Sequence, residues 1–117
     1  MNLFFCGNVC GLINKITTDE KVNHLHREVE LFPENSDAFY NLGNAYLKLQ
    51  KYNTAIDYYL KSLEIKPKAT DAMINIALIY FQHLENCKEG IRWAYKILNE
   101  DVSHGRAKTI LKRCGDI

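Results

Sequence analysis

The sequence predicts an all-α protein, an α-solenoid of antiparallel helix pairs, from three observations on its 117 residues. The chain repeats itself with a period of 34 residues, its apolar residues recur at helical spacing, and Pro33 and Pro67 end two helical segments one period apart. The identities at this offset include Glu30/Glu64, Pro33/Pro67, Asp37/Asp71, Ala38/Ala72, Asn41/Asn75 and Tyr46/Tyr80. A period of this length is typical of stacked supersecondary units, so we expect each helix pair to pack on the next.

The clearest helix pair is expected in residues 36–69. Its first helix carries an apolar stripe at i, i+3, i+4 and i+7, and the stripe of its second helix follows the polar turn LQKYN. The first stripe is Phe39, Leu42, Gly43 and Tyr46, and the second is Ala55, Ile56, Tyr59, Leu60 and Leu63. Gly43 and Ala55 lack bulk where the two helices should cross, so we expect the backbones to approach closely there.

Short polar motifs predict where the helices begin. Ser36-Asp37 and Thr70-Asp71 offer an N-cap oxygen and a first-turn carboxylate to the first helix of each pair. Asn86-x-x-Glu89 and Thr17-x-x-Glu20 have the spacing of capping boxes for second helices.

Residues 70–104 are expected to form the next helix pair, and residues 2–35 a weaker one before it. One extra residue in the inter-helix turn of 70–104 places Gly90 where Ala55 lies in the preceding pair. In residues 2–35 the register of the first helix stays open between two alignments, whereas the second helix is marked by Val22, Leu25, His26 and Val29. Residues 105–117 have the pattern of another first helix or of a short cap, and we expect a single domain over residues 1–117.

Composition and charge exclude several classes of protein. Apolar residues make up 47% of the chain and charged residues 25%, as in ordinary soluble globular proteins. The formal net charge of +1 creates no global field that favours nucleic acid, an anionic membrane or an acidic substrate. The apolar N-terminal run is too short and interrupted to span a bilayer, and it lacks the features of a secretory signal. We therefore expect a cytoplasmic protein without membrane contact, with free thiols at Cys6, Cys10, Cys87 and Cys114.

The residue pattern of 36–69 resembles the tetratricopeptide repeat. Phe39-x2-Leu42-Gly43-x2-Tyr46, Ala55-x3-Tyr59 and Pro67 match seven positions of that repeat, with Phe for the usual Trp and Tyr for the usual Phe. Residues 70–104 resemble a degenerate second copy. The resemblance implies a right-handed solenoid of about three repeats, approximately 2–35, 36–69 and 70–104, whose first helices line a concave inner face.

This implied inner face is the candidate partner-binding groove. Its residues are Tyr40, Asn44, Leu47, Lys48, Ile74, Asn75, Leu78, Phe81 and Gln82, with Arg106 from the last segment. An apolar strip on it is not explained by packing within the helix pairs: Tyr40, Leu47, Ile74, Leu78 and Phe81. Such a strip is typical of an interaction surface. The alternative is a flanking helix or a second copy that covers the strip permanently.

The resemblance also suggests the carboxylate clamp with which some tetratricopeptide domains hold the C-terminal tails of heat-shock chaperones. In that clamp, charge-assisted bonds from amides and cations bind the terminal carboxylate. Asn44, Asn75 and Arg106 match three of the five clamp positions, but Tyr40 and Ile110 stand where cations are expected. This mismatch favours another kind of peptide.

Metal binding, catalysis and nucleic-acid binding have weaker support. Cys6-x3-Cys10 and His83-x3-Cys87 have i, i+4 spacing, but nothing pairs the two dyads into the four ligands of structural zinc. We expect neither metal nor cofactor, and cysteines that pack as small apolar residues. No phosphate loop, nucleophile elbow or zinc-protease motif occurs, so we expect neither an enzyme nor a small-molecule substrate. The segment GRAKTILKRC offers a few phosphate contacts, yet cations near a helix C-terminus have a simpler electrostatic reason.

We therefore expect a non-catalytic protein–protein interaction adaptor that binds a peptide or helix of a partner protein in its concave groove. The alternative is a self-assembling scaffold, a homodimer formed through the open ends of the solenoid or by helix exchange. The apolar opening NLFFCGNVCGLI motivates this second hypothesis, because the terminal repeats of a solenoid need polar outer faces.

Overall fold

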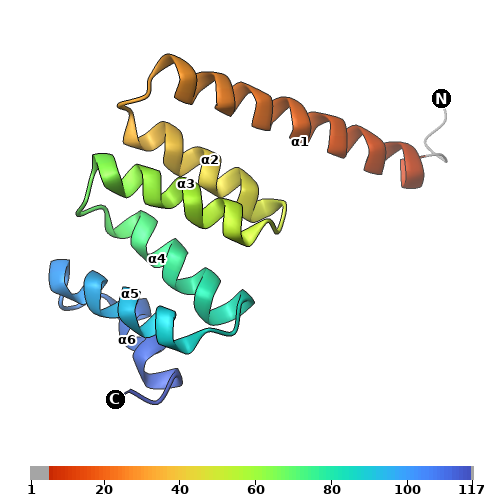
Figure 1. Ribbon diagram of the computed structural model, residues 1–117. Coiled ribbons are helices and arrows are strands. Elements are labelled where there is room, and N and C mark those ends of the chain that lie inside the picture. The colour runs from red at the N-terminus through yellow and green to blue at the C-terminus, as the bar shows by residue number, and fades with distance from the viewer. Residues whose placement is uncertain (1–5, 117) are drawn as a thin grey trace.

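The computed structural model describes the backbone of residues 6–116 and the side chains of residues 19–116, and every regular element in that part of the chain is helical. The elements are α1 (Cys6–Leu31), α2 (Ser36–Lys48), α3 (Tyr52–Ile65), α4 (Thr70–Leu78), η2 (Ile79–His83), α5 (Cys87–Glu100) and α6 (Gly105–Arg113). They stack in sequence order from α1 to α6 (Figure 1). The radius of gyration is 17.0 Å, above the roughly 13 Å expected of a compact domain of this length. The predicted all-α solenoid is confirmed.

The pair α2–α3 packs closely because a residue without a side chain lies where the helices cross. Leu42, Ala55 and Tyr59 are completely buried. A Cβ atom built on Gly43 would lie 2.7 Å from two ring carbons of Tyr59, which is too close for an unstrained contact. The prediction that Gly43 allows a close approach is confirmed, and the group that approaches it is the Tyr59 ring.

The start of α2 differs from the predicted N-cap. Asn35 caps the helix, because its Oδ1 atom accepts a hydrogen bond from the Asp37 N–H at 3.0 Å. Ser36 instead forms a reciprocal pair with the buried Ser62 of α3, in which each hydroxyl donates to the carbonyl oxygen of the other residue. Thr70 likewise lies inside α4, whose N-cap makes no side-chain hydrogen bond. The predicted caps at Ser36 and Thr70 were wrong by one residue, since the Ser36 hydroxyl is used to join two helices.

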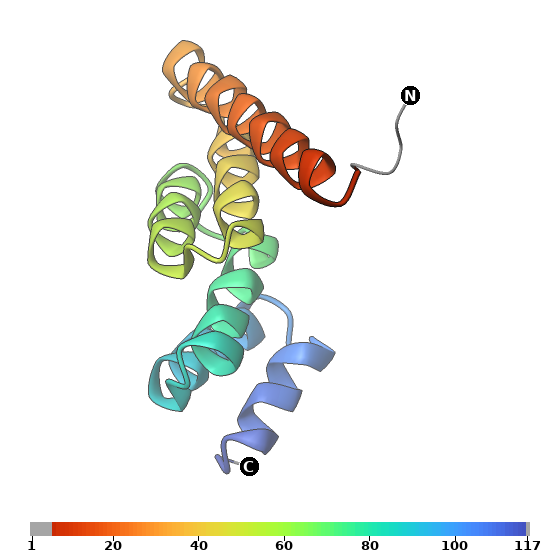
Figure 2. The same ribbon diagram turned by 90° about the vertical axis from the view of Figure 1, so that its right-hand side faces the viewer.

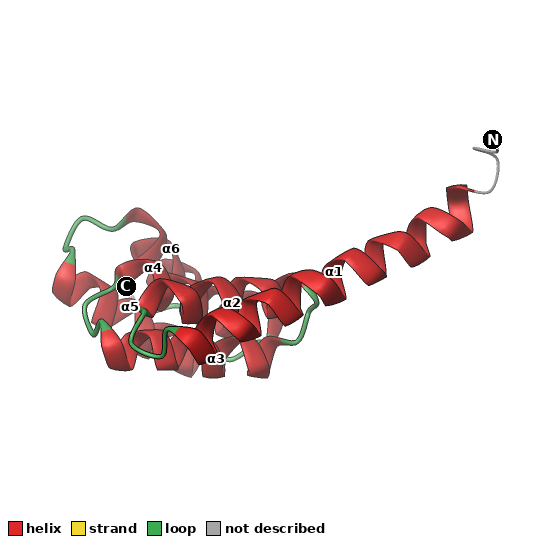
Figure 3. Cartoon of the chain, turned by 90° about the horizontal axis from the view of Figure 1, so that it is seen from above, coloured by secondary structure: helices red, strands yellow, loops and turns green. Residues whose placement is uncertain are grey.

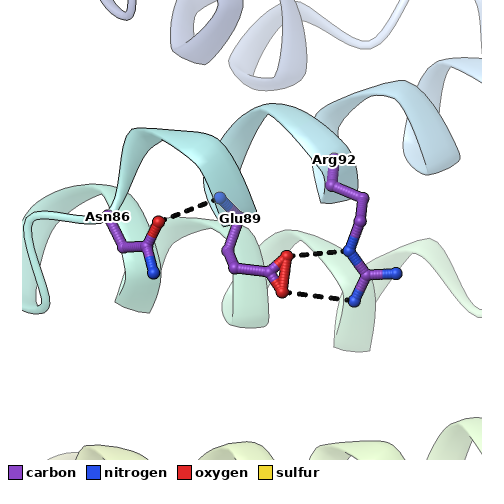
Figure 4. A network of polar contacts seen from close by, with 3 residues as sticks. All are labelled: Asn86, Glu89 and Arg92. Carbon is purple, nitrogen blue, oxygen red and sulfur yellow. Dashed lines mark hydrogen bonds and ion pairs between the residues drawn. The ribbon is translucent and has the colours of Figure 1, made fainter.

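The start of α5 agrees with its prediction in part. The Oδ1 atom of Asn86 accepts a hydrogen bond from the Glu89 N–H at 3.1 Å, as an N-cap does (Figure 4). The Glu89 carboxylate lies 2.8 Å from Nε of Arg92, and this hydrogen bond lowers the pKa of Glu89. The helix start is thus capped as predicted, while the acidic side chain pairs with a cation further along α5.

The extra residue of the second helix pair lies in a helix and not in the turn that follows it. α4 starts 34 residues after α2, and α5 starts 35 residues after α3. The turns 49–51 and 84–86 have the same length, whereas α4 continues into the π-helical segment η2. A π-helical turn absorbs one inserted residue without ending the helix, so the predicted place of the insertion was wrong.

The N-terminal helix pair expected in residues 2–35 is replaced by one continuous helix, α1, of 26 residues. No proline or glycine occurs in residues 12–32 to end this helix, and the predicted cap at Thr17 falls in its interior. Its C-terminal part packs on α2 as predicted for a second helix, with Val22 and Leu25 buried beside Leu42. Its N-terminal part continues past the other helices (Figure 3). The two alignments of the first helix depend on side chains outside the described residues.

α6 forms a short capping helix at the other end of the stack. Its buried residues are Ala107, Ile110 and Leu111, and it packs on α4 and α5 (Figure 2). A Schellman motif ends it: the Gly115 and Asp116 N–H groups donate to the carbonyl oxygens of Lys112 and Leu111, and Gly115 has a φ of 79°. α6 is the last described helix of the stack, and it starts 35 residues after α4, the same offset that separates α5 from α3.

A disulfide joins Cys87, at the start of α5, to Cys114, at the C-cap of α6. The expectation of free thiols is therefore wrong for these two residues, because the packing of α5 on α6 brings them together across 27 positions of sequence. Cys6 and Cys10 lie outside the described side chains. Because Cys87 and Cys114 are bonded, free thiols at these residues no longer support the expected cytoplasmic location. None of the described helices combines the length and the apolar character needed to cross a bilayer.

Candidate functional site

α2 and α4 carry most of the predicted groove and contact each other through it. Asn75 of α4 lies within hydrogen-bond distance of Tyr40 and Asn44 of α2. The partly exposed residues of the predicted groove are Tyr40, Asn44, Leu47, Asn75, Leu78 and Phe81, and the exposed ones are Lys48, Gln82 and Arg106. Nine of the ten predicted residues therefore reach solvent.

A network of amides and tyrosine hydroxyls joins α2, α3 and α4. The Nδ2 atom of Asn75 lies 3.2 Å from Oδ1 of Asn44, 3.2 Å from the Tyr59 hydroxyl and 3.3 Å from the Tyr40 hydroxyl. The Tyr59 hydroxyl donates to Oδ1 of Asn44 at 2.5 Å. Burial raises the pKa of Tyr59, and its ring packs on that of Tyr40 with the centroids 5.6 Å apart. These contacts hold the four side chains in one arrangement.

This arrangement leaves an amide donor for a ligand. Oδ1 of Asn44 accepts from both Tyr59 and Asn75, which places the Nδ2 group of Asn44 on the other branch of the amide. No hydrogen bond among the described residues involves this Nδ2 group. The group is accessible to solvent, because no buried polar side-chain atom in that part of the chain lacks a partner. A carbonyl or carboxylate oxygen of a partner can accept from it without breaking the network.

Asn44 and Asn75 were predicted as polar residues of the groove, but their common hydrogen-bond partner, Tyr59, was not predicted. Tyr59 belongs to the apolar stripe of α3 and is completely buried. A buried hydroxyl nearly always has a hydrogen-bond partner. Tyr in place of the usual Phe was therefore a signal that a polar side chain lies next to this position.

Ile74 does not belong to the accessible surface. Its exposed fraction is 2%, whereas Tyr40, at the same position one repeat earlier, is partly exposed. α6 packs on α4 and adds Ile110 and Leu111 to the apolar cluster that contains Ile74. The prediction of Ile74 as a groove residue was wrong, since one side of α4 is covered by a helix of the chain itself.

Phe81 lies at the edge of this covered region. A Cβ atom built on Gly90 of α5 would lie 3.5 Å from Cβ of Phe81 and 3.6 Å from Cγ2 of Ile110 in α6. Phe81 thus packs where α4, α5 and α6 meet and exposes only part of its side chain. The accessible part of the predicted strip is Tyr40, Leu47 and Leu78, with Phe81 at its margin.

The positively charged side chains of α6 stay exposed. They are Arg106, Lys108, Lys112 and Arg113, and no ion pair joins any of them to another described residue. Ile110, at the clamp position where a cation is expected, is 1% exposed. Tyr40, at the other such position, is held by Asn75 and packs on Tyr59. Asn44 and Asn75 thus stand at the amide positions that the resemblance assigned to a clamp, while two of its cations have no counterpart.

Three hollows in the surface of the described residues lie outside the predicted groove. Two adjoining ones share Pro33, Glu34 and Ile65, and another contains Pro67, Met73 and Lys96. Their lining residues recur one repeat apart, as the pairs Pro33/Pro67, Phe39/Met73 and Lys61/Lys96 show. Residues one period apart therefore occupy equivalent surroundings, as stacked repeats require.

The described residues contain no group of three or more potential metal ligands. Cys87 is bonded to Cys114, and the His83 ring stacks on Tyr52 with centroids 4.3 Å apart. The side chains of the dyad His83-x3-Cys87 are thus committed to other contacts. The dyad Cys6-x3-Cys10 lies outside the described side chains.

Comparison with known proteins identifies the repeat. The family model of the tetratricopeptide repeat matches residues 36–69. A search of curated proteins gave no significant match.

Solved structures of tetratricopeptide domains share the fold. The first such domain of Spaghetti (RPAP3), bound to the HSP90 peptide SRMEEVD, superposes with a TM-score of 0.73 at 17% identity, over 97% of this chain and 91% of that one. The second such domain of human RPAP3, in complex with the HSP70 peptide SGPTIEEVD, has a TM-score of 0.73 at 19% identity, over 90% and 87% of the two chains. YrrB, described as having an unusual peptide-binding site, has a TM-score of 0.73 at 21% identity, over 86% of this chain and 52% of its own.

Proposed function

Since residues 36–69 are a tetratricopeptide repeat and the described helices have the fold of tetratricopeptide domains, we propose that this chain is a non-catalytic protein-interaction adaptor. It holds a short segment of a partner protein on one surface, which we name the α2–α4 face. This face consists of Tyr40, Asn44, Leu47, Lys48, Asn75, Leu78 and Gln82.

The observation that carries the proposal is the ordered Asn44–Asn75 pair among partly exposed apolar side chains. The amide hydrogen bonds between α2 and α4 fix the donor of Asn44, so little side-chain entropy is lost when a ligand binds there. Leu47 and Leu78 supply apolar contact area beside it. A few directed polar groups among apolar ones are typical of sites that bind a peptide in a defined register.

The chemistry of the face favours a segment with apolar side chains over an acidic chain terminus. Both RPAP3 domains are bound to chaperone peptides that end in Glu-Glu-Val-Asp. In this chain Tyr40 and the buried Ile110 occupy positions where the clamp for such tails has cations. The partner we propose therefore presents main-chain carbonyl groups to Asn44 and apolar side chains to Leu47 and Leu78.

A displayed peptide library selected on the intact domain supplies ligands for a calorimetric test. The test variant combines Lys48→Glu and Gln82→Glu, two exposed positions of the α2–α4 face, with Leu78→Ala. The control variant carries Lys68→Glu and Asn53→Glu, which are exposed and lie outside that face. We expect at least about tenfold weaker binding in the test variant and unchanged binding in the control, with helicity retained in both. Equal affinities of the two variants would contradict the proposal, and tight binding of SRMEEVD would contradict the proposed ligand class.

A second candidate function, self-assembly, is favoured by the length of α1. Where a helix pair was expected, α1 runs on for 26 residues and projects past the stack (Figure 3). A helix that has not folded back into a pair is the form that exchange between two copies requires. Light scattering over a dilution series tests this candidate, since exchange predicts a dimer that dissociates on dilution. A concentration-independent monomer would eliminate it.

A further inference from the structure

The capping helix α6 is attached to the solenoid by two links at its C-terminal end. Cys114, at its C-cap, is bonded to Cys87 of α5, and Asp116 just beyond accepts a hydrogen bond from the Tyr95 hydroxyl of α5. The helix itself has nine residues and buries Ala107, Ile110 and Leu111. An isolated helix of this length is not stable in water, so α6 depends on its packing and on these links.

α6 covers apolar surface that the repeat would otherwise expose. Ile74, in the helix on which α6 packs, is 2% exposed and belongs to the same apolar cluster as Ile110 and Leu111 of α6. Ile110 of α6 also reaches the point where Phe81 meets Gly90. Detachment of α6 would therefore add Ile74 and the covered side of Phe81 to the margin of the α2–α4 face.

The disulfide makes this detachment costly. With the bond in place, α6 is tied at its start through residues 101–104 and at its end through Cys114. A cross-link between residues 27 apart removes most of the freedom that the segment would gain on unfolding. Without it, only the connection 101–104, the packing and the Tyr95–Asp116 hydrogen bond hold α6 in place.

We propose that the Cys87–Cys114 bond is a redox-sensitive clasp on α6, which opens in the presence of a thiol reductant and exposes the Ile74–Phe81 surface. A thiolate attacks the sulfur of Cys87, whose residue is exposed, and Cys114 leaves as a thiolate. A second thiol then releases Cys87, so the pair gains two electrons and the reductant leaves as its disulfide. The clasp itself does not rest on the proposed function, but the use of the freed surface for partner binding does.

Amide hydrogen exchange read by mass spectrometry tests the clasp. Cys6→Ser and Cys10→Ser are introduced first, so that Cys87 and Cys114 are the only cysteines. On addition of dithiothreitol we expect exchange in residues 105–113 to become roughly a hundredfold faster, while exchange in α2 and α3 stays unchanged. Fluorescence of anilinonaphthalene sulfonate should rise in parallel, because this dye binds newly exposed apolar surface.

The matched control adds Cys87→Ser and Cys114→Ser to the same background. Its α6 should exchange quickly both with and without dithiothreitol. Unchanged exchange of α6 on reduction would overturn the proposal. So would equal acceleration in α2, α3 and α6, because the bond would then hold the whole fold and not one helix. Neither readout involves a peptide, so failure of the clasp is distinguishable from failure of the α2–α4 face as a binding site.

Discussion

At the scale of single residues, one absent side chain and one hydroxyl organise the contact between α2, α3 and α4. Gly43 gives the Tyr59 ring room to lie against the backbone of α2. From there the Tyr59 hydroxyl reaches Asn44, and Asn44 in turn accepts from Asn75. The same glycine that allows tight packing thus places the tyrosine that orients the amides of the α2–α4 face.

Gly43→Ala should destabilise the protein, whereas Gly90→Ala should not. The new methyl group at Gly43 would lie 2.7 Å from the buried Tyr59 ring, while the one at Gly90 would have its nearest neighbour at an ordinary 3.5 Å. Alanine also favours the helix at both positions by about 1 kcal/mol. We expect the free energies of unfolding of the two variants in urea to differ by about 2 kcal/mol, with Gly43→Ala the less stable. Equal stabilities would contradict the packing described here.

The buried hydroxyl of Tyr59 predicts a loss of stability at high pH. Burial raises its pKa above the ordinary value of 10.0 in the folded protein. Below pH 10.0 the Tyr59 hydroxyl keeps its proton in both the folded and the unfolded state, so its full contribution to the free energy of unfolding is present. Above it the unfolded state loses the proton first, so stability falls until the folded pKa is reached. The free energy of unfolding, measured in urea between about pH 8 and pH 11, should therefore fall more steeply with pH for the native protein than for Tyr59→Phe. Parallel curves would show that Tyr59 does not titrate differently in the two states.

At the scale of helices, α2 is followed by a residue, Gln50, whose backbone conformation is strained for any residue except glycine. Gln50 has a φ of 60°, and a Schellman motif surrounds it, with the Lys51 N–H bonded to the carbonyl oxygen of Tyr46 and the Gln50 N–H to that of Leu47. Glu85, 35 positions later, has a φ of 48° after η2. Both residues adopt a left-handed conformation that glycine adopts without strain.

Gln50→Gly should therefore raise the free energy of unfolding by about 0.5 to 1 kcal/mol, and Glu85→Gly should act in the same direction. Lys48→Gly serves as the control, since this residue lies in the last turn of α2 and glycine there should destabilise by about 1 kcal/mol. Thermal unfolding followed by circular dichroism separates the three variants. A lower melting temperature for Gln50→Gly than for the native protein would contradict the assignment of this turn.

The helices themselves were well predicted from the sequence, because their signals are local. Apolar spacing and prolines located α2, α3 and the following pair, and Gly43 marked a real crossing. Contacts between distant segments carried no such signal. The bond from Cys87 to Cys114 depends on how α6 packs on α5, and the 34-residue period gave no sign of that bond or of the burial of Ile74. The continuity of α1 was missed because of a misleading local signal. The motif Thr17-x-x-Glu20 was interpreted as the start of a second helix, although no residue near it ends the first.

At the scale of the whole molecule, the chain is an elongated stack whose two ends differ. It measures 57 × 34 × 21 Å, with α1 at one end and the capping helix α6 near the other (Figure 1). Small-angle scattering of the monomer should give a radius of gyration at or somewhat above 17.0 Å. A value near the ~13 Å of a compact domain would mean that the helices do not stack as described.

The central claim is that a partner segment binds across α2 and α4. Its most direct test is an NMR titration of the isotope-labelled domain with a library-selected peptide, followed through the backbone amide signals. We predict the largest shifts in residues 40–48 and 75–82, together with the side-chain amide of Asn44. Shifts concentrated on α3 and α5, with residues 40–48 unaffected, would contradict the claim.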